Sequence, residues 1–483
     1  MQLCDLTVHE LQLLLAKKET SAEEILDSCL KRMAEVETDV RAFLTRLDDS
    51  ARLAARAIDK QGDYKGLAGI PYALKDNFCT RGVHTTCASK MLENFVPFYD
   101  ATAARRLADA KGILLGKLNM DEFALGCSTE QSAFFPTRNP WDYSRVPGGS
   151  SGGCAAAVAS GEIPFSLGSD TGGSIRQPAS FCGLVGMKPT YGRVSRWGVV
   201  ACASSLDQVG TLTRDVADCA LIMSLISAHD PLDSNSVNLP VPDYMENLQP
   251  DIKGLKIAYP REYFQQGVDE QVKATVLQAL KTYEDMGALV AEVSLPHSEY
   301  ALPAYLLVLA AEVSTNLAKY DGVRFGLRDH EAENVTEMFS QTRGKGFGDE
   351  VKRRILLGTY ALSSGQYEAY YLKALKLRRL IKSDFDKVLA DFDVIATPTA
   401  PGIAFKLGAH KDPLTLYRHN ILTAPVNMAG LPAISIPCGF VDNMPVGMQL
   451  IGKPFDEAVI IKAAYAFEQA TAFHLNRPDL GVK

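Results

Sequence analysis

The sequence predicts an α/β fold in which a central β-sheet is covered by helices on both faces, preceded by a helical N-terminal region. Two observations lead to this prediction. From residue 66 onward, short apolar runs with the length of buried strands alternate with segments of helical periodicity. Residues 6–60 instead carry two helix-start signals and apolar residues at helical spacing.

The N-terminal helices are predicted from their starts. Thr7 with Glu10, and Ser21 with Glu24, fit the capping-box pattern, in which a hydroxyl and a carboxylate satisfy the free amides at a helix start. The second predicted helix places apolar residues on one face, namely Ile25, Leu26, Cys29, Leu30 and Met33. We expect this face to pack on the chain itself.

The alternating region follows in order along the chain. Asp100 is a candidate cap for a helix that runs through Ala110 and ends at Lys111-Gly112. The expected strands are 69–74, 113–116, 163–167, 255–259 and 394–396, and the further expected helices are 155–160, 269–287 and 367–390. Residues 230–252, rich in Asp, Pro and Asn, are expected to form a connecting segment.

We expect a single domain over residues 1–483, because no other stretch resembles a linker. Its parts are the helical region 1–60, a core 66–215 that holds the catalytic motifs, and the remainder 216–483 with substrate-pocket residues. Hydrophobic residues make up 47% and charged residues 22%, the balance of an ordinary globular protein.

Charge and composition exclude several classes of function. The net charge of −7 argues against a broad nucleic-acid-binding surface, although a local basic patch at 352–354 is compatible with it. The ten cysteines form no Cys-x-x-Cys pair, which favours reduced, buried thiols in a cytoplasmic protein. We expect no signal peptide, no membrane span and no metal site, since the histidines lack ligand spacing.

Lys75 ends the apolar run Gly69–Leu74 and is the first candidate catalytic residue. An apolar pocket disfavours the charged form of a lysine and lowers its pKa, so that the amine can accept a proton. The alternative is a surface lysine that ends a strand beside Asp76.

Two glycine-rich serine segments follow Lys75. The first, Gly148–Gly153, requires backbone conformations that glycine permits. A phosphate-binding loop and a structural turn are alternatives, but a P-loop ends in Gly-Lys-Ser/Thr, whereas Gly153 precedes Cys154.

The second segment, Gly168–Gly183, follows a predicted strand. Backbone amides at Thr171, Gly172, Gly173 and Ser174 can converge on one point as an oxyanion hole, with Ser174 as the nucleophile. The alternative is an anion-binding turn without covalent chemistry. Together with Lys75, the two segments predict acyl transfer and favour cleavage of a carboxamide.

These motifs together resemble the amidase signature family. The matching stretch runs from Gly69 to Thr213, with Ser150 lying 75 residues after Lys75 (150 − 75) and Ser174 lying 24 after Ser150 (174 − 150). Weaker similarity continues to the C-terminus. The resemblance implies a mixed central β-sheet with helices on both faces.

The resemblance also implies the catalytic roles. Lys75 is then the base, Ser150 the bridging serine after a cis peptide bond, and Ser174 the nucleophile. Thr171, Gly172 and Gly173, with Ser174, are implied as the oxyanion amides. Ser174 would attack the carboxamide carbon while its proton passes through Ser150 to Lys75. Protonated Lys75 would return a proton to the leaving ammonia, and water would hydrolyse the acyl-enzyme.

Within the family, the chain resembles the glutaminase subunits of tRNA-dependent amidotransferases, through stretches such as Met120–Ala124, Lys188–Arg196 and Pro425–Pro432. This resemblance implies a heterotrimer with a larger tRNA-binding subunit and with one small subunit. The larger partner would use ammonia, ATP and magnesium to amidate glutamyl-tRNA(Gln). Use of aspartyl-tRNA(Asn) is also compatible with the resemblance. No cofactor is implied for this chain.

The resemblance suggests how glutamine would be selected. Arg354 aligns with an arginine that grips the α-carboxylate, a task suited to guanidinium. Tyr305 and Ser128 are weaker pocket candidates, with a core tyrosine and a structural serine as alternatives. Asn420 occupies a position where the family subunit carries an aspartate, which would pair with the α-ammonium. We therefore expect weaker glutamine binding, or wider tolerance of other amides, because an asparagine accepts a hydrogen bond without providing charge.

Two alternatives to this function are considered. A free-standing amidase that acts on small or apolar amides is the main alternative. Free-standing relatives often have terminal additions and lack a region like that around Arg354, so the layout of this chain favours the amidotransferase subunit. A non-enzymatic scaffold is disfavoured because competent residues fill all three triad positions, Lys75, Ser150 and Ser174.

Overall fold

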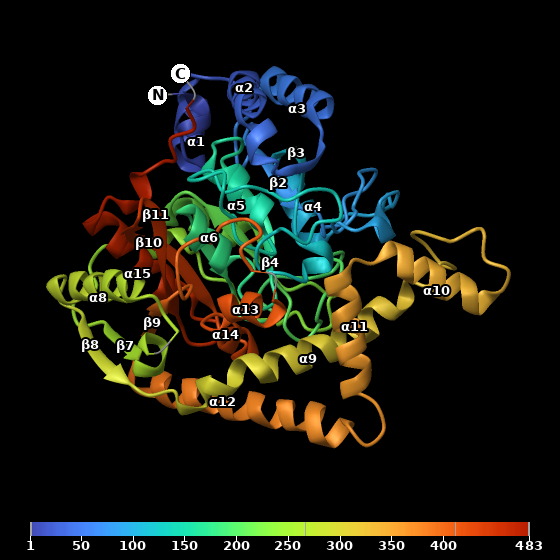
Figure 1. Cartoon of the computed structure of the whole chain (residues 1–483). Coiled ribbons are helices and arrows are strands. Elements are labelled where there is room, and N and C mark those ends of the chain that lie inside the picture. The colour runs from blue at the N-terminus through green and yellow to red at the C-terminus, as the bar shows by residue number, and fades with distance from the viewer. Residues whose placement is uncertain (1, 266, 411, 482–483) are drawn as a thin grey trace.

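One mixed β-sheet of eleven strands organises the chain (Figure 1). The structure is a computed structural model that describes residues 2–265, 267–410 and 412–481. In spatial order the strands are β1 (Phe43–Arg46), β3 (Ile113–Leu118), β2 (Pro71–Lys75), β4 (Phe165–Asp170), β6 (Gln208–Thr213), β5 (Val185–Lys188), β10 (Ala433–Val441), β11 (Met444–Ile451), β9 (Val394–Pro398), β7 (Lys256–Pro260) and β8 (Leu289–Val293).

Strand directions in the sheet are mixed, as predicted. Strand β2 pairs in parallel with both β3 and β4, and β7 pairs in parallel with β8 and β9. The central pairs from β4 through β6, β5, β10 and β11 to β9 are antiparallel. Strands β2, β4, β5, β6, β9 and β11 are buried at every position, so both faces of the sheet are covered. The predicted fold class is confirmed.

Helices cover both faces and both ends of the sheet. They are α1 (Val8–Lys17), α2 (Ala22–Val40), α3 (Asp48–Gln61), α4 (Thr102–Asp109), α5 (Gly152–Ala159), α6 (Arg176–Cys182), α7 (Val216–Ile226), α8 (Glu270–Asp285), α9 (Ala301–Asn316), α10 (Val335–Gly346), α11 (Asp349–Ala361), α12 (Lys373–Asp391), α13 (Pro413–Tyr417), α14 (Ala424–Ala429) and α15 (Glu457–Ala470). The short central helices α5 and α6 are buried throughout: α5 begins within the first glycine-rich segment, and α6 lies within the second.

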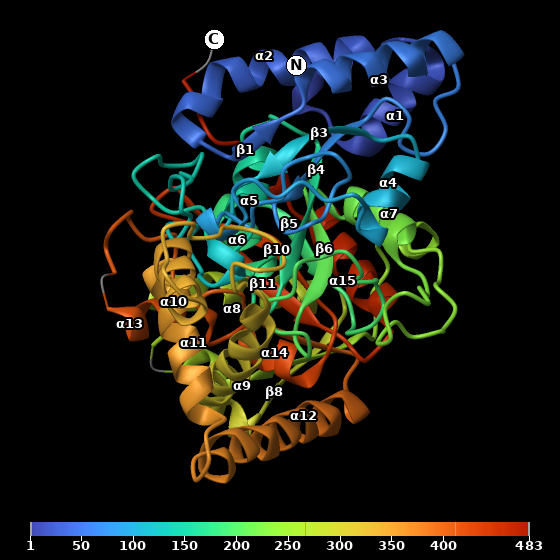
Figure 2. The same ribbon diagram turned by 90° about the vertical axis from the view of Figure 1, so that its right-hand side faces the viewer.

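The N-terminal helices form a layer along one edge of the molecule, at the top of Figure 2. Both predicted capping boxes are present, at Thr7 and at Ser21. The predicted apolar face of α2 is buried against α3 and the sheet. One part of the prediction is wrong: Phe43–Arg46 is a strand rather than helix, because it pairs antiparallel with β3 at the edge of the sheet.

Two other local predictions also need correction. Helix α4 is not capped by Asp100, because its N-cap is Ala101 and the Asp100 carboxylate accepts the backbone N–H of Arg81 instead. The helix expected over 367–390 begins as a π-helical turn, Tyr367–Leu372, before α12 starts at Lys373. Helix α8 follows the prediction of a helix over 269–287 closely, and the structure adds that Asp269 is its N-cap.

Strands β10 and β11 form a hairpin that the sequence analysis missed. The turn residues Asp442 and Asn443 both have positive φ, 50° and 61°, which asparagine and aspartate tolerate in two-residue hairpin turns. This hairpin lies in the middle of the sheet between β5 and β9, so it joins the N-terminal and C-terminal strands.

Helices α9, α11 and α12 form a long arm below the sheet in Figure 1. The stretch Pro296–Lys319, which contains α9, is long and apolar enough for a membrane span by composition, and half of that window is buried within the protein. It packs against α11 and α12, and core helices of soluble proteins have the same composition.

The crossing of α9 and α11 requires a glycine at 358. A Cβ atom there would collide with the carbonyl oxygen of Ala310 in α9. We expect Gly358→Ala to lower the free energy of unfolding by about 1–3 kcal/mol, because the two helices must separate. The matched control is Gly344→Ala in α10, where a Cβ meets open space; it should stabilise by about 0.5–1 kcal/mol. Equal effects of the two substitutions in denaturant unfolding would contradict this account of the crossing.

Candidate active site

Lys75 lies at the carboxyl end of β2, with no exposed surface. Its Nζ donates hydrogen bonds to Ser150 Oγ (2.7 Å), Ser169 Oγ (2.9 Å) and Ser169 O (3.3 Å). Burial lowers the pKa of Lys75 to about 8. The amine is therefore partly neutral near physiological pH, as a proton acceptor must be.

The buried Ser150 follows a cis peptide bond between Gly149 and Ser150, as the resemblance implied. The Gly149 N–H donates to Gln177 Oε1 (2.9 Å). A Cβ atom on Gly149 would collide with the carboxylate of Asp121 and the backbone of Ser128, so glycine is required at this position. Asp121 in turn accepts the amides of Ser128 and Gln131 at 3.2 and 3.1 Å. These contacts fix the bridging serine against Lys75.

Ser174 is almost fully buried in the loop that follows β4. Its carbonyl oxygen accepts the N–H of Ser151 (3.2 Å), which brings it to the turn that carries Ser150. The Asp170 carboxylate accepts the N–H groups of Gly173 (2.7 Å) and Ile175 (3.1 Å). The structure thus brings the three predicted triad residues into one buried cluster.

The candidate oxyanion amides separate into two kinds. The N–H of Gly173 already donates to the Asp170 carboxylate, so it is not available to bind an oxyanion, contrary to the prediction. Within the described residues, the amides of Thr171, Gly172 and Ser174 have no hydrogen-bond acceptor among the protein groups. The loop shape requires glycine, since Gly173 has φ +130° and a Cβ atom on Gly172 would collide with Tyr305 Oη.

A buried ion pair holds this loop. Arg176 Nε and Nη2 donate to the two carboxylate oxygens of Asp170, both at 3.1 Å, and neither side chain is exposed. Arg176 also donates to Gln449 Oε1 (2.9 Å) and Thr423 O (3.2 Å). Burial acts to raise the pKa of Asp170, but the charge and hydrogen bonds of Arg176 outweigh burial and hold that pKa well below its usual range.

A narrow cavity beside the cluster contains three of the predicted pocket residues, Tyr305, Arg354 and Asn420. Arg354 Nη1 and Asn420 Oδ1 are buried, and neither has a hydrogen-bond partner among the described residues. The cavity therefore holds two polar groups without a partner in the part of the chain that the structure describes: a donor on the charged Arg354 side chain and an acceptor on the neutral Asn420 side chain. Buried groups of this kind are costly unless a ligand pairs with them.

Sequence comparison agrees with this geometry. A family model described as Amidase matches residues 24–461. The chain belongs to the amidase signature family. It is 65% identical over 482 residues to a Syntrophomonas wolfei protein named as the A subunit of glutamyl-tRNA(Gln) amidotransferase, covering 100% of this chain and 99% of that protein. It is 60% identical to the protein of the same name from Moorella thermoacetica, with 100% of both chains covered.

Solved structures of this family have the same fold. The crystal structure of the glutamyl-tRNA(Gln) amidotransferase A subunit from Thermotoga maritima superposes with a TM-score of 0.82 at 43% identity, covering 98% of this chain and 96% of that one. A peptide amidase in complex with the inhibitor chymostatin gives a TM-score of 0.84 at 28% identity, covering 98% and 99%. The amidase signature fold therefore accommodates different amides around a similar scaffold.

The fourth predicted pocket residue, Ser128, lies outside the lining of this cavity. Ser128 is buried, but it does not line the cavity that holds Arg354. Its hydroxyl accepts the N–H of Glu130 (3.4 Å) and its own N–H donates to Asp121. Ser128 thus supports the loop beside Gly149, and its contact with substrate stays a prediction.

Sequence reasoning missed several residues that shape the site. Asn77 Nδ2 donates to Ser169 Oγ (3.0 Å), so Asn77 and Ser169 fix the environment of the Lys75 amine. Asn77 belongs to the motif that contains Lys75, and that proximity was the available signal. Glu350, which holds Arg354, lies four residues before it on α11, and that i,i+4 spacing was the available signal. Tyr417 gave no local signal because it lies on a different helix, α13.

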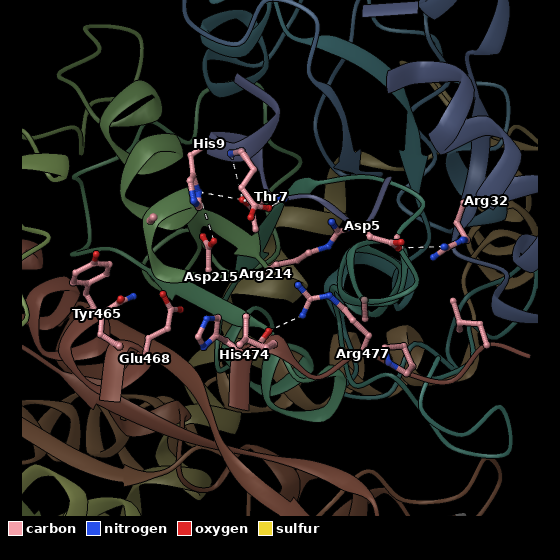
Figure 3. Close-up of a pocket in the computed structure, with 18 of the residues that line it drawn as sticks. Asp5, Thr7, His9, Arg32, Arg214, Asp215, Tyr465, Glu468, His474 and Arg477 are labelled. Carbon is pink, nitrogen blue, oxygen red and sulfur yellow. Dashed lines mark hydrogen bonds and ion pairs between the residues drawn. The ribbon is translucent and has the colours of Figure 1, made fainter. Parts of the chain in front are cut away.

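A wider cavity, about 700 Å³, lies elsewhere, between the first residues of the chain, around Asp5–Glu10, and the C-terminal segment His474–Leu480 (Figure 3). Here His9, Asp215 and Asp218 have the spacing of a metal-binding group. Asp218 already accepts the N–H groups of Val8 (2.7 Å) and His9 (3.0 Å) as well as the His9 ring (2.9 Å). This cluster therefore anchors the start of α1, and we assign no metal to it.

Proposed function

We propose that this chain is the glutamine-hydrolysing A subunit of a glutamyl-tRNA(Gln) amidotransferase. The observation that carries the proposal is the cavity in which Arg354 Nη1 and Asn420 Oδ1 are both unsatisfied, next to the cluster of Lys75, Ser150 and Ser174. Glutamine carries a carboxylate and an ammonium group at one end and a carboxamide at the other. Full-length identity to proteins of that name supports the same function.

The proposed reaction is an acyl transfer through Ser174. The Ser174 hydroxyl attacks the carboxamide carbon while its proton passes through Ser150 to the neutral amine of Lys75. The amides of Thr171, Gly172 and Ser174 stabilise the resulting oxyanion. Protonated Lys75 returns the proton through Ser150 to the departing amide nitrogen, which leaves as ammonia. Water then hydrolyses the ester on Ser174 and releases glutamate.

The cavity residues select the amino-acid end of the substrate. Arg354 Nη1 donates to the α-carboxylate, a charge-assisted hydrogen bond. Asn420 Oδ1 accepts a hydrogen bond from the α-ammonium. Tyr305 lines the same cavity and lies against Gly172 of the oxyanion loop.

The ammonia is used by a partner. A larger tRNA-binding partner, the B subunit, would activate glutamyl-tRNA(Gln) with ATP and magnesium and amidate it to glutaminyl-tRNA(Gln). A small partner, the C subunit, would complete a cytoplasmic heterotrimer. No cofactor is assigned to this chain. Its net charge of −7 supports a division in which the larger partner makes the main tRNA contacts.

The direct test is ammonia release from glutamine. The wild-type chain, alone and with its two partner subunits, is compared with Ser174→Ala in the same preparations. We expect release that requires Ser174 and rises with the partners and glutamyl-tRNA(Gln). Turnover of simple amides by the chain alone, without any glutamine hydrolysis, would instead identify a free-standing amidase.

The pH dependence of the reaction follows from Lys75. Since burial lowers the pKa of Lys75 to about 8, the neutral base becomes more abundant as pH rises through that value. We expect kcat for glutamine to increase about tenfold from pH 7 to pH 9 and then level off. A kcat that is flat over this range would show that Lys75 does not accept the proton.

Asn420 sets the strength of ammonium binding. Asn420→Asp adds a negative charge where the α-ammonium binds, so it should lower KM for glutamine by about tenfold. Asn420→Ala removes the acceptor and should raise KM. Steady-state kinetics with glutamine and asparagine tests both changes; an unchanged KM for glutamine in Asn420→Asp would remove Asn420 from the ammonium site.

A further inference from the structure

We propose that Glu350 and Tyr417 are positioning residues that present the Arg354 guanidinium to the substrate carboxylate. The proposal rests on the proposed function, because it concerns how the same cavity recognises the amino-acid end of an amide donor. Neither residue touches the triad. Both act through Arg354, whose Nη1 is the unsatisfied donor of the cavity.

Glu350 fixes one edge of the guanidinium. Arg354 Nε donates to Glu350 Oε1 at 2.7 Å, and the two residues lie one turn apart on α11. Because the Nε edge is occupied, the Nη1 end of the fork is the part left to bind a ligand. Glu350 and Arg354 are both buried, so water competes little for this contact.

Tyr417 fixes the plane of the guanidinium. The Arg354 Cζ atom lies 3.8 Å from the centroid of the Tyr417 ring, in a cation–π stack. The Tyr417 hydroxyl donates to the same Glu350 Oε1, at 2.7 Å. One carboxylate oxygen therefore holds both the edge of Arg354 and the ring that covers its face. A side chain with many rotamers is thereby held in one orientation before substrate binds.

The charges of the cluster favour an anionic ligand. Glu350 also forms an ion pair with Arg353, so two guanidinium groups share a single carboxylate. The cluster of Arg353, Arg354 and Glu350 therefore carries a net charge of +1. Tyr417 packs on the cluster and is neutral, because burial raises its pKa to about 12. Tyr305 and Cys127 line the same cavity, and burial raises the pKa of each well above its usual value, so they add no negative charge. A substrate carboxylate would neutralise the remaining positive charge.

The helix that carries Glu350 is itself anchored. The N–H of Gly348, just before α11, donates to Glu122 Oε2 at 2.9 Å. Glu122 is buried and also accepts the hydroxyl of Ser89. These hydrogen bonds fix the start of α11 relative to the core. They thereby also fix the cluster of Arg353, Arg354 and Glu350, which lies in the first turns of that helix.

The test separates carboxylate recognition from chemistry. Kinetics of the assembled enzyme are measured with glutamine and with butyramide, an amide without carboxylate or ammonium, for Glu350→Ala, Glu350→Gln, Tyr417→Ala and Tyr417→Phe. We expect Glu350→Ala and Tyr417→Ala to raise KM for glutamine by about tenfold or more, with kcat changed less than about threefold. Turnover of butyramide should fall by less than about threefold, so that the larger loss is specific to the substrate that carries a carboxylate.

The conservative variants distinguish positioning from mere support of the fold. Glu350→Gln keeps an acceptor for Arg354 Nε and Tyr417→Phe keeps the stacked ring, so each should recover most of the wild-type KM. Asp386→Ala is the matched control, because Asp386 also forms an i,i+4 ion pair, with Lys382, but on the exposed face of α12. It should leave both substrates unaffected.

Three outcomes overturn the proposal. If wild-type enzyme hydrolyses glutamine and the two alanine variants keep its KM, the positioning role is contradicted and the proposed function stands. A parallel loss of butyramide turnover contradicts it too, because the residues would then support the fold. Wild-type enzyme that releases no ammonia from glutamine contradicts the proposed function, and with it this assignment.

Discussion

The buried ion pair between Asp170 and Arg176 is the interaction on which the site depends. Two charges removed from water are expensive unless every polar atom finds a partner. Here the hydrogen-bond partners of the two side chains come from the backbone of the catalytic loop and from the C-terminal third of the chain, namely Gln449, Thr423 and Asn427. The loop that carries Ser174 is therefore defined by contacts between segments about 250 residues apart, and the oxyanion amides keep their direction without a ligand.

The same burial has opposite effects on two catalytic neighbours. Among the described residues, Lys75 has three oxygen acceptors and forms no ion pair with a carboxylate, so burial lowers its pKa to about 8. Asp170 is just as buried, but Arg176 keeps it ionised. A neutral base and a fixed anion can thus lie at the ends of neighbouring strands, because the partners of each side chain decide its charge. In the substrate cavity, too, the partners of a side chain decide the local charge: Arg353 and Arg354 share the single carboxylate of Glu350, which leaves a net positive charge.

Local patterns in the sequence predicted the parts of the molecule that local physics determines. The capping boxes at Thr7 and Ser21, the strand that ends at Lys75 and the helix over 269–287 were all predicted from local patterns. The central hairpin of β10 and β11 was not, since its place in the sheet depends on pairing with β5 and β9. In the site, motifs predicted Lys75, Ser150 and Ser174. The engaged amide of Gly173 and the support of Arg354 by Tyr417 needed three-dimensional contacts between distant segments.

The most direct test of this account is to remove Arg176 and measure the reactivity of Ser174. In Arg176→Gln, labelling of Ser174 by a fluorophosphonate reagent is followed alongside denaturant unfolding. The account predicts a loss of about 3–5 kcal/mol in the free energy of unfolding. It also predicts labelling at least about a hundredfold slower in the fraction that remains folded, because the oxyanion amides lose their direction. A folded variant whose Ser174 reacts at the wild-type rate would show that the ion pair does not hold the catalytic loop.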